Sequence, residues 1–292
     1  MATTAITADM VKRLRDQTGA GMMECKNALT EASGDFEGAT TVLRKRGLAS
    51  VAKKAGRTTS EGLIGSRLSG DHSSGILVEV NCESDFVART DDFKQLVQDV
   101  LTEIEKAGDA ANEAWLKDPN ASVLKLVAHK IAKLGENMAV PRFVRYAGRG
   151  YVGQYVHAVG GKLGVQVELG GVTPALHERG EVSTLVKEIA MHIAAASPSP
   201  ACVSRDGVPA ETLERERTIY RAQVEGKPAN VIDKIVAGKL ESFYQQFVLL
   251  DQPSIRDPKQ SVKDVIAQVN KTLGASISVT RFARLKVGET LQ

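Results

Sequence analysis

The feature that most constrains the fold is an internal repeat in the middle of the chain. Gly62-Leu-Ile-Gly65 recurs as Gly150-Tyr-Val-Gly153, and Gly75-Ile-Leu-Val-Glu79 recurs as Gly164-Val-Gln-Val-Glu168. The apolar pattern at 96–100 returns at 185–189, so the offset stays at 88 or 89 residues through strand, turn and helix. A near-constant offset of this kind indicates two copies of one structural unit.

Each copy has the pattern of a two-stranded hairpin followed by helices. Glycines bound the turns at 70–75 and 160–164, as expected for hairpin connections. In the first copy, apolar periodicity predicts helices over 93–106, 112–117 and 123–133. Antiparallel hairpins with helices packed on them predict an α+β fold.

The N-terminal segment is predicted to form a small three-helix bundle. Helices are expected over 8–18 and 22–33, and a third helix capped by Asp35 is expected to end near Gly47. The basic run at 44–57 follows. It suits either an RNA-contacting strip or a solvated joint between domains, and the lack of interleaved aromatic residues favours the joint.

The C-terminal part is predicted to add a protruding helical hairpin. Its helices are expected over 209–224 and 230–247, joined at Gly226 and Pro228. A helix over 261–273 and a strand over 277–287 that could rejoin the core sheet follow. The predicted division is 1–56 for the N-terminal module, 57–148 and 149–205 for the two core copies, 206–247 for the hairpin and 248–292 for the segment returning to the core.

Composition and motifs exclude several classes of protein. A net charge of +3 over 292 residues does not by itself indicate nucleic-acid binding. Three widely spaced cysteines, Cys25, Cys82 and Cys202, indicate neither a zinc site nor a disulfide framework. Without a signal-peptide pattern or an apolar stretch of membrane length, we expect a cytoplasmic protein. Phosphate-loop, dinucleotide and hydrolase motifs are absent from the sequence, so we expect no cofactor, no bound metal and no enzymatic activity.

One segment carries a polar and aromatic group directly after a buried strand. Ile76 to Val80 is an unbroken apolar run, and Ser84, Asp85, Phe86 and Val87 follow soon after it. Phe86 is either a core residue folded back onto the sheet or an exposed wedge. The second copy has Gly170-Gly-Val-Thr-Pro-Ala at this place, without an Asp-Phe pair. This difference favours the wedge.

Two separated segments resemble the signatures of the bacterial elongation factor Ts family. Glu79-Val-Asn-Cys82 running into Ser84-Asp-Phe-Val87 resembles the family's Glu-Val-Asn-Cys and Thr-Asp-Phe-Val segments, with Ser84 in place of the commoner Thr. The N-terminal LRDQTGAGMMECKNAL, residues 14–29, resembles the second signature. The resemblance covers nearly the whole chain.

The resemblance implies a guanine nucleotide exchange factor that promotes GDP release from the translational GTPase elongation factor Tu. It implies binding to the GDP-bound and nucleotide-free partner and no direct nucleotide binding. In the family the helical hairpin is used either for self-association, as a dimer or 2:2 complex, or for contact with the partner's far domain. A hairpin that is only a solvated projection is the alternative. Residues expected to bind the partner and dislocate its Mg²⁺ are Ser84, Asp85, Phe86 and Val87. Further partner-binding residues implied by the resemblance are Arg15, Met22, Met23, Lys26 and His157.

Alternatives remain for several of these residues and for the function. Met22 and Met23 either pack together in the small bundle or place at least one side chain outward, because neighbours on a helix point about 100° apart. His157 is either a structural strand residue or a partner contact. An RNA-binding protein associated with translation is the alternative function, and a purely structural dimer is a third.

Overall fold

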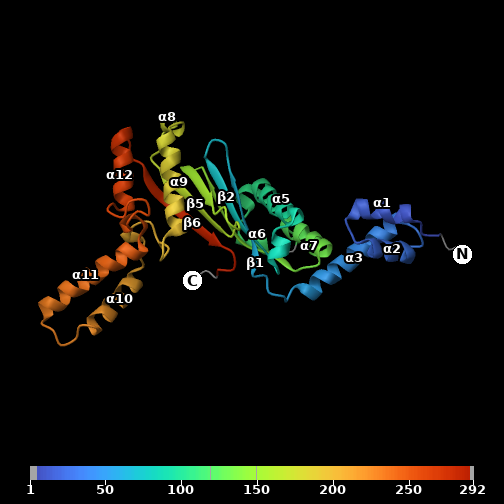
Figure 1. Cartoon of the computed structure of the whole chain (residues 1–292), viewed down its shortest axis with the longest axis horizontal. Coiled ribbons are helices and arrows are strands. Elements are labelled where there is room, and N and C mark those ends of the chain that lie inside the picture. The colour runs from blue at the N-terminus through green and yellow to red at the C-terminus, as the bar shows by residue number, and fades with distance from the viewer. Residues whose placement is uncertain (1–4, 119, 149, 290–292) are drawn as a thin grey trace. The chain divides into compact units, whose positions relative to one another are not determined.

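A computed structural model describes residues 5–118, 120–148 and 150–289 of the chain, with elements labelled as in Figure 1. The chain forms two compact units that interleave in sequence. The first contains Met1–Gly65, Val78–Phe143 and Lys286–Gln292, and the second contains Ser66–Leu77 and Val144–Leu285. The finer five-part division stays a prediction.

The N-terminal helices follow their capping signals. They are α1 (Ala8–Thr18), α2 (Met22–Glu31) and α3 (Phe36–Lys54). The Thr7 side chain caps α1, and Gly19 ends it with φ of +68°, a conformation that favours glycine. The small core consists of the buried residues Val11, Leu14, Cys25, Ala28, Leu29 and Ala39.

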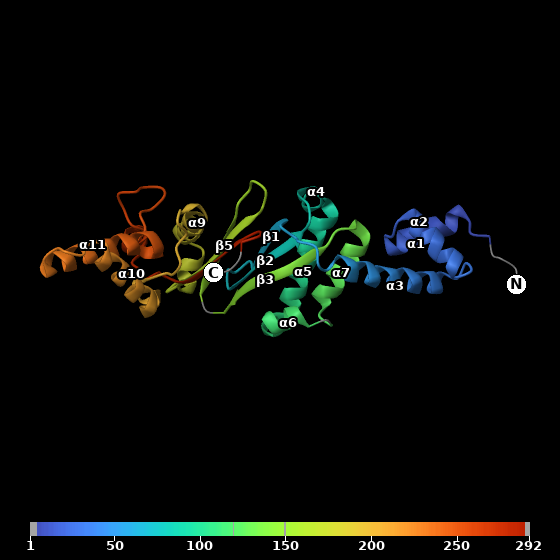
Figure 2. The same ribbon diagram turned by 90° about the horizontal axis from the view of Figure 1, so that it is seen from below.

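The prediction that the third helix ends near Gly47 was wrong. Helix α3 continues to Lys54 through most of the basic run and packs against α7 (Ser122–Leu134) in the first unit. A Cβ atom on Gly47 would lie 3.3 Å from the Ala132 Cβ, so glycine here permits close helix packing. This tertiary contact outweighs the low helix propensity of glycine. Figure 2 shows α3 leading toward α7.

Within the described ranges, the strands form two three-stranded antiparallel sheets, so the predicted α+β class is confirmed. One sheet has the order β1-β2-β3 and the other β4-β5-β6. The strands are β1 (Glu61–Leu68), β2 (Ser74–Cys82), β3 (Met138–Ala147), β4 (Tyr151–Val156), β5 (Leu163–Gly170) and β6 (Ser278–Lys286). The C-terminal strand therefore rejoins a sheet, as expected, whereas β3 was not predicted. Proline and two arginines interrupt the apolar pattern of this edge strand.

The duplicated glycines do the same work in both copies. A Cβ atom on Gly65 of β1 would lie 2.4 Å from the Val97 side chain of α5 (Asp91–Ala107). A Cβ atom on Gly153 of β4 would lie 2.5 Å from the Val186 side chain of α9 (Gly180–Ala195). Val97 and Val186 are themselves 89 residues apart. Glycine at both positions therefore lets a helix approach the sheet closely.

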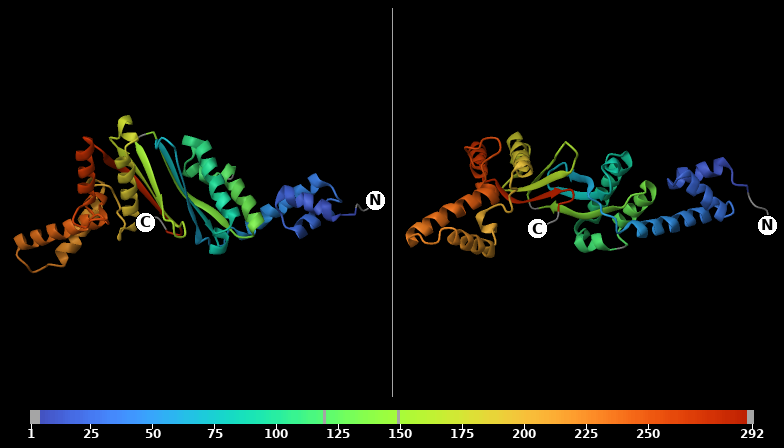
Figure 3. Two further views of the ribbon diagram at one scale, coloured as in Figure 1. Left: turned by 45° about the horizontal axis from the view of Figure 1, so that its top comes forward. Right: turned by 60° about the horizontal axis from the view of Figure 1, so that its bottom comes forward.

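The other elements complete the two units. They are α4 (Asp85–Ala88), α6 (Glu113–Lys117), α8 (Pro174–His177), α10 (Ala210–Ala222), α11 (Ala229–Phe247), α12 (Val262–Leu273) and short 3₁₀ turns at Gly108–Ala110, Arg205–Gly207 and Leu249–Asp251. In the second unit, α9 lies along β4 and β5, as Figure 3 shows. Helices α10 and α11 form the expected hairpin, and α10 contains no buried residue.

Candidate partner-binding surface

The Phe86 side chain projects from a single helical turn into solvent. It belongs to α4, is 81% exposed, and lies two residues before the buried Ala88. Val87 is half-buried. The exposed-wedge interpretation therefore describes the free chain, because an exposed ring of this size contributes nothing to the core beneath it.

The second copy carries a matching turn without the aromatic ring. Helix α8 begins at Pro174, 89 residues after the start of α4 at Asp85. Ala175 occupies the place of Phe86 and is exposed too. Because this position faces solvent in both copies, closing the structural unit does not require a phenyl ring.

A carboxylate from a distant segment fastens the first residue of this turn. Glu136, in the connection between α7 and β3, accepts the Ser84 backbone N–H at 3.0 Å and the Ser84 hydroxyl at 2.5 Å. The same hydroxyl oxygen accepts the N–H of Val87 at 3.3 Å and so caps α4. Ser84 therefore faces its own molecule and supports the turn.

Hydrogen bonds of the two residues before Ser84 also hold this turn in place. The Glu83 carboxylate accepts the N–H of Asn137 at 2.6 Å, and the Asn137 side chain donates to the Arg57 carbonyl at 2.8 Å. The Cys82 thiol donates to the Ser84 carbonyl at 3.1 Å. Burial, with smaller contributions from nearby carboxylates, raises the pKa of Cys82 to about 12. The thiol therefore keeps its proton at neutral pH, and this hydrogen bond is retained.

The acidic residue of the turn is paired within it. Asp85 accepts a hydrogen bond from Arg89 at 2.7 Å, and its side chain is 40% exposed. An exposed pair of this kind is weak. Asp85 can therefore exchange its intramolecular partner for another group without a large loss of stability.

Both methionines of α2 face solvent. Met22 is 56% exposed and Met23 is 66% exposed, so the alternative in which the two pack in the bundle core was wrong. The first turn of α2 lies before the helix's buried residues, which begin at Cys25. Arg15 and Lys26 are exposed as well. The N-terminal bundle thus exposes two flexible apolar side chains and two cations.

His157 lies in the β4–β5 turn of the second unit. It is exposed, and its Nδ1 lies 3.0 Å from the Tyr155 hydroxyl. Its backbone closes the turn, with its N–H donating to the Leu163 carbonyl at 2.8 Å. Val159, two residues farther along, is 79% exposed. The expected site residues therefore lie on three separate segments, with His157 in a different unit from the others.

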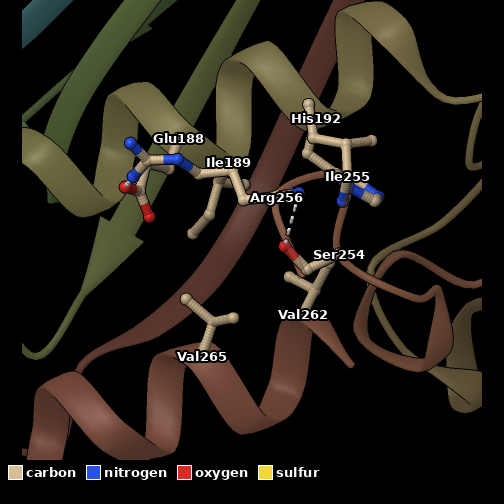
Figure 4. A pocket seen from close by; sticks show the side chains of 8 residues that line it. All are labelled: Glu188, Ile189, His192, Ser254, Ile255, Arg256, Val262 and Val265. Atoms are coloured by element: carbon tan, nitrogen blue, oxygen red, sulfur yellow. Dashed lines mark hydrogen bonds and ion pairs between the residues drawn. The ribbon is translucent and has the colours of Figure 1, made fainter. Parts of the chain in front are cut away.

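A small pocket between α9 and α12 does not have the character of a ligand site. Half of its lining, shown in Figure 4, is aliphatic, and the two charged residues that line it, Glu188 and Arg256, form an ion pair with each other. His192, which also lines the pocket, is buried and already hydrogen-bonded, since its Nε2 lies 2.8 Å from the Gln252 side-chain oxygen. Within the described residues, no three side chains of His, Cys, Asp or Glu cluster as a metal site would require.

Comparisons with known proteins extend over almost the whole chain. A family model described as "Elongation factor TS" matches residues 83–289. Elongation factor Ts of Aquifex aeolicus is 43% identical, over 97% of this chain and 98% of its own length. Elongation factor Ts of Trichlorobacter lovleyi is 42% identical, over 99% and 94%, and that of Nostoc is 40% identical, over 98% and 94%. The chain belongs to the elongation factor Ts family.

Membership of the elongation factor Ts family makes this chain a translation elongation factor. The family model covers the Phe86 turn, Glu136 and His157. The alignment with the Aquifex aeolicus protein, over 97% of this chain, also covers the N-terminal bundle. In the described part of the chain, no helix has the length and apolar character to cross a membrane.

Sequence reasoning selected Phe86, Met22 and Met23 as candidate contact residues of this chain, left their exposure open, and missed Glu136. The residue lies 52 positions from Ser84 and precedes a strand that was itself not predicted. Gly135, which ends α7 with φ of +80°, was the available signal of a sharp change of direction there. That signal places a turn at Glu136 but gives no indication of its partner.

Proposed function

We propose that this chain is a guanine nucleotide exchange factor for the translational GTPase elongation factor Tu, acting in the cytoplasm without catalysing covalent chemistry. The observation that carries the proposal is the 81% exposed Phe86 ring on a turn held by hydrogen bonds from a distant segment. A large apolar side chain kept in water on a firm base suits insertion into another protein.

In the proposed mechanism, Phe86 inserts between helices of the GTPase domain. Asp85 and the backbone of α4 then disturb the groups that order Mg²⁺ at the partner's nucleotide site. Loss of this cation removes charge neutralisation at the phosphates. His157 contacts the partner near its phosphate loop, while Arg15, Met22, Met23 and Lys26 dock the N-terminal bundle on its nucleotide domain.

One aromatic side chain does not account for the whole effect. A ten-thousand-fold acceleration requires about 5.5 kcal/mol of barrier lowering, at about 1.36 kcal/mol per decade. Burying one phenylalanine supplies about 1.5–3 kcal/mol. The remainder must come from the other contacts. By linkage, nucleotide and this factor must weaken each other's binding to the GTPase by equal factors.

The test is the release of fluorescent GDP from elongation factor Tu with and without this protein. We expect Phe86→Ala to slow the stimulated release about ten- to hundred-fold, which corresponds to the loss of one buried ring. Ile255→Ala is the matched control, because Ile255 is an exposed apolar residue outside the proposed contacts, at 44% exposure. An unchanged rate with Phe86→Ala would remove Phe86 from the mechanism.

The helical hairpin supports a second element of the proposal, association into a dimer or a 2:2 complex. Ile219 on α10 and Val231 on α11 are 42% and 37% exposed. Ile219→Glu should reduce the molecular mass of the complex in light scattering without slowing GDP release. A mass that matches a 1:1 complex for the unmodified protein would contradict this element alone.

A further inference from the structure

We propose that Glu136 is a positioning residue for nucleotide exchange, which holds the Phe86 turn in its active orientation before the partner arrives. This inference rests on the proposed exchange function, and it assigns a role to a half-buried residue of a segment distant in sequence from the turn.

Glu136 fixes the direction of the hydroxyl that caps α4. The Ser84 hydroxyl gives its only proton to one carboxylate oxygen at 2.5 Å, which turns its lone pairs toward the N–H of Val87 at 3.3 Å. The second carboxylate oxygen accepts the Ser84 backbone N–H at 3.0 Å. The carboxylate thus holds both the backbone and the side chain of the cap.

The turn requires such support because it has little of its own. Helix α4 has four residues, and an isolated helix of this length does not form in water. Its largest side chain, Phe86, is 81% exposed and therefore does not anchor the turn by burial. Hydrogen bonds at the cap consequently decide the direction in which the ring projects.

Glu136 is itself held at a rigid point. It stands between Gly135, which ends α7, and Asn137, which is 8% exposed and is hydrogen-bonded to Glu83 and Arg57. Helix α7 is in turn tied to the start of α5, since Lys130 and Lys133 lie 3.0 Å and 2.7 Å from the Asp92 carboxylate. Helix α7, which precedes Glu136, and helix α5, which follows the turn, are therefore joined by ion pairs that do not involve the turn.

The second copy lacks both the aromatic ring and a carboxylate that corresponds to Glu136. Thr173 stands in the place of Ser84 and makes no side-chain cap hydrogen bond. Glu136 lies six residues before Arg142, and the residue six before the corresponding Arg281 is Ala275. The carboxylate thus occurs in the copy whose turn carries an exposed phenylalanine, and it is missing where the turn carries alanine.

The test compares GDP release and partner binding for variants of Glu136 and Ser84. Glu136→Gln preserves the shape, but its amide group has one acceptor oxygen in place of two. We expect the stimulated release rate at saturating factor to fall about ten-fold, with binding to nucleotide-free elongation factor Tu changed less than about three-fold. Ser84→Ala should give the same pattern from the other side of the contact. Glu178→Gln, at an exposed glutamate of the second unit, is the control.

A double-mutant cycle separates positioning from a general structural effect. If Glu136 acts through the ring, Glu136→Gln causes no further slowing in a Phe86→Ala background. Additive slowing, or an unchanged rate for both Glu136→Gln and Ser84→Ala, overturns the positioning role while leaving the exchange function intact. If Phe86→Ala itself does not slow GDP release, both the proposed role of Phe86 and the positioning role of Glu136 are wrong. Should Glu136→Gln fail to fold, Ser84→Ala carries the same test.

Discussion

The carboxylate of Glu168 is completely buried and lies 2.7 Å from the Nε atom of Arg281. Glu79, which is 89 residues earlier, lies 2.7 Å from Nε of Arg142 in the same way. The two arginines come from β6 and β3, the third strands of the two sheets. The duplication therefore extends beyond the hairpins to an ion pair, formed by a buried glutamate and an arginine, that ties each third strand to its neighbour.

Replacing Arg281 should destabilise the second unit. Arg281→Met leaves the Glu168 carboxylate without its partner. Breaking a fully buried pair typically costs about 3–5 kcal/mol, and the cost here should be smaller because the Arg281 side chain is 37% exposed. The contact of the guanidinium with the Tyr146 ring, 3.9 Å from its centroid, is lost as well. Urea unfolding measures the change. Adding Glu168→Met to this variant should recover part of the stability, and no recovery would mean that the ion pair is not the source of the loss.

Alanine at the second glycine of either repeat should also destabilise the protein. In Gly65→Ala and Gly153→Ala, the new methyl group overlaps a valine of the packed helix at 2.4 Å or 2.5 Å. Overpacking against a stiff β-branched side chain costs about 1–3 kcal/mol. Thermal unfolding should show a lower midpoint for both variants.

The matched control for these substitutions is Gly238→Ala in the middle of α11. A Cβ atom there meets nothing within 4 Å. Alanine should therefore stabilise the helix by about 0.5–1 kcal/mol. If all three alanine variants shift the unfolding midpoint in the same direction, close packing at Gly65 and Gly153 does not determine the change in stability.

The repeat made most of the core predictable, and the exceptions have physical causes. The hairpins β1-β2 and β4-β5 followed from one duplicated pattern, and Gly19 and Asp35 marked helix limits through backbone preferences. The length of α3 depended on its packing against Ala132, which leaves no local signal. Strand β3 was missed because Pro141 and Arg142 interrupt its apolar alternation, although Arg142 is there to neutralise Glu79.

The candidate site shows the same limit. The sequence favoured exposure of Phe86 over burial because the second copy, with an alanine at that place, provides an internal comparison, and the structure decides for exposure. Nothing comparable existed for Met22 and Met23, since helical periodicity allowed a core position for both. The contact between Ser84 and Glu136 joins segments far apart in sequence through hydrogen bonds, and the hydropathy pattern does not predict such a contact.

Burial of His192 should make stability depend on pH. Burial lowers the pKa of His192 below its ordinary value of about 6.5. The Gln252 amide N–H groups donate to two carbonyls, so its oxygen accepts from Nε2, while Nδ1 accepts the N–H of Ile255 at 3.4 Å. The folded state therefore holds a neutral imidazole. As pH falls below about 6.5, the unfolded state gains a proton first and stability decreases, by at most about 1.4 kcal/mol per pH unit.

Urea unfolding at pH 7.5 and 5.5 measures this dependence. His192→Gln keeps a donor for Gln252 but does not titrate, so it should reduce the difference between the two pH values. His129→Gln, at an exposed histidine on α7, should leave the difference unchanged. Glu188 and Arg256 line the same pocket and are present in both variants. An unaltered difference in His192→Gln would assign the pH dependence to other groups.

Truncating the exposed methionines of α2 should weaken partner binding without affecting stability. Met22 and Met23 are 56% and 66% exposed, so Met22→Ala and Met23→Ala should change the free energy of unfolding by less than about 0.5 kcal/mol. If these side chains dock on elongation factor Tu, each truncation should cost about 1 kcal/mol of binding, a roughly five-fold weaker affinity. Titration calorimetry with the nucleotide-free GTPase measures this, with Asn27→Ala on the same helix as the control. Equal affinities for all three variants would place the docking surface elsewhere, whereas a large loss of stability would mean that the methionines support the bundle.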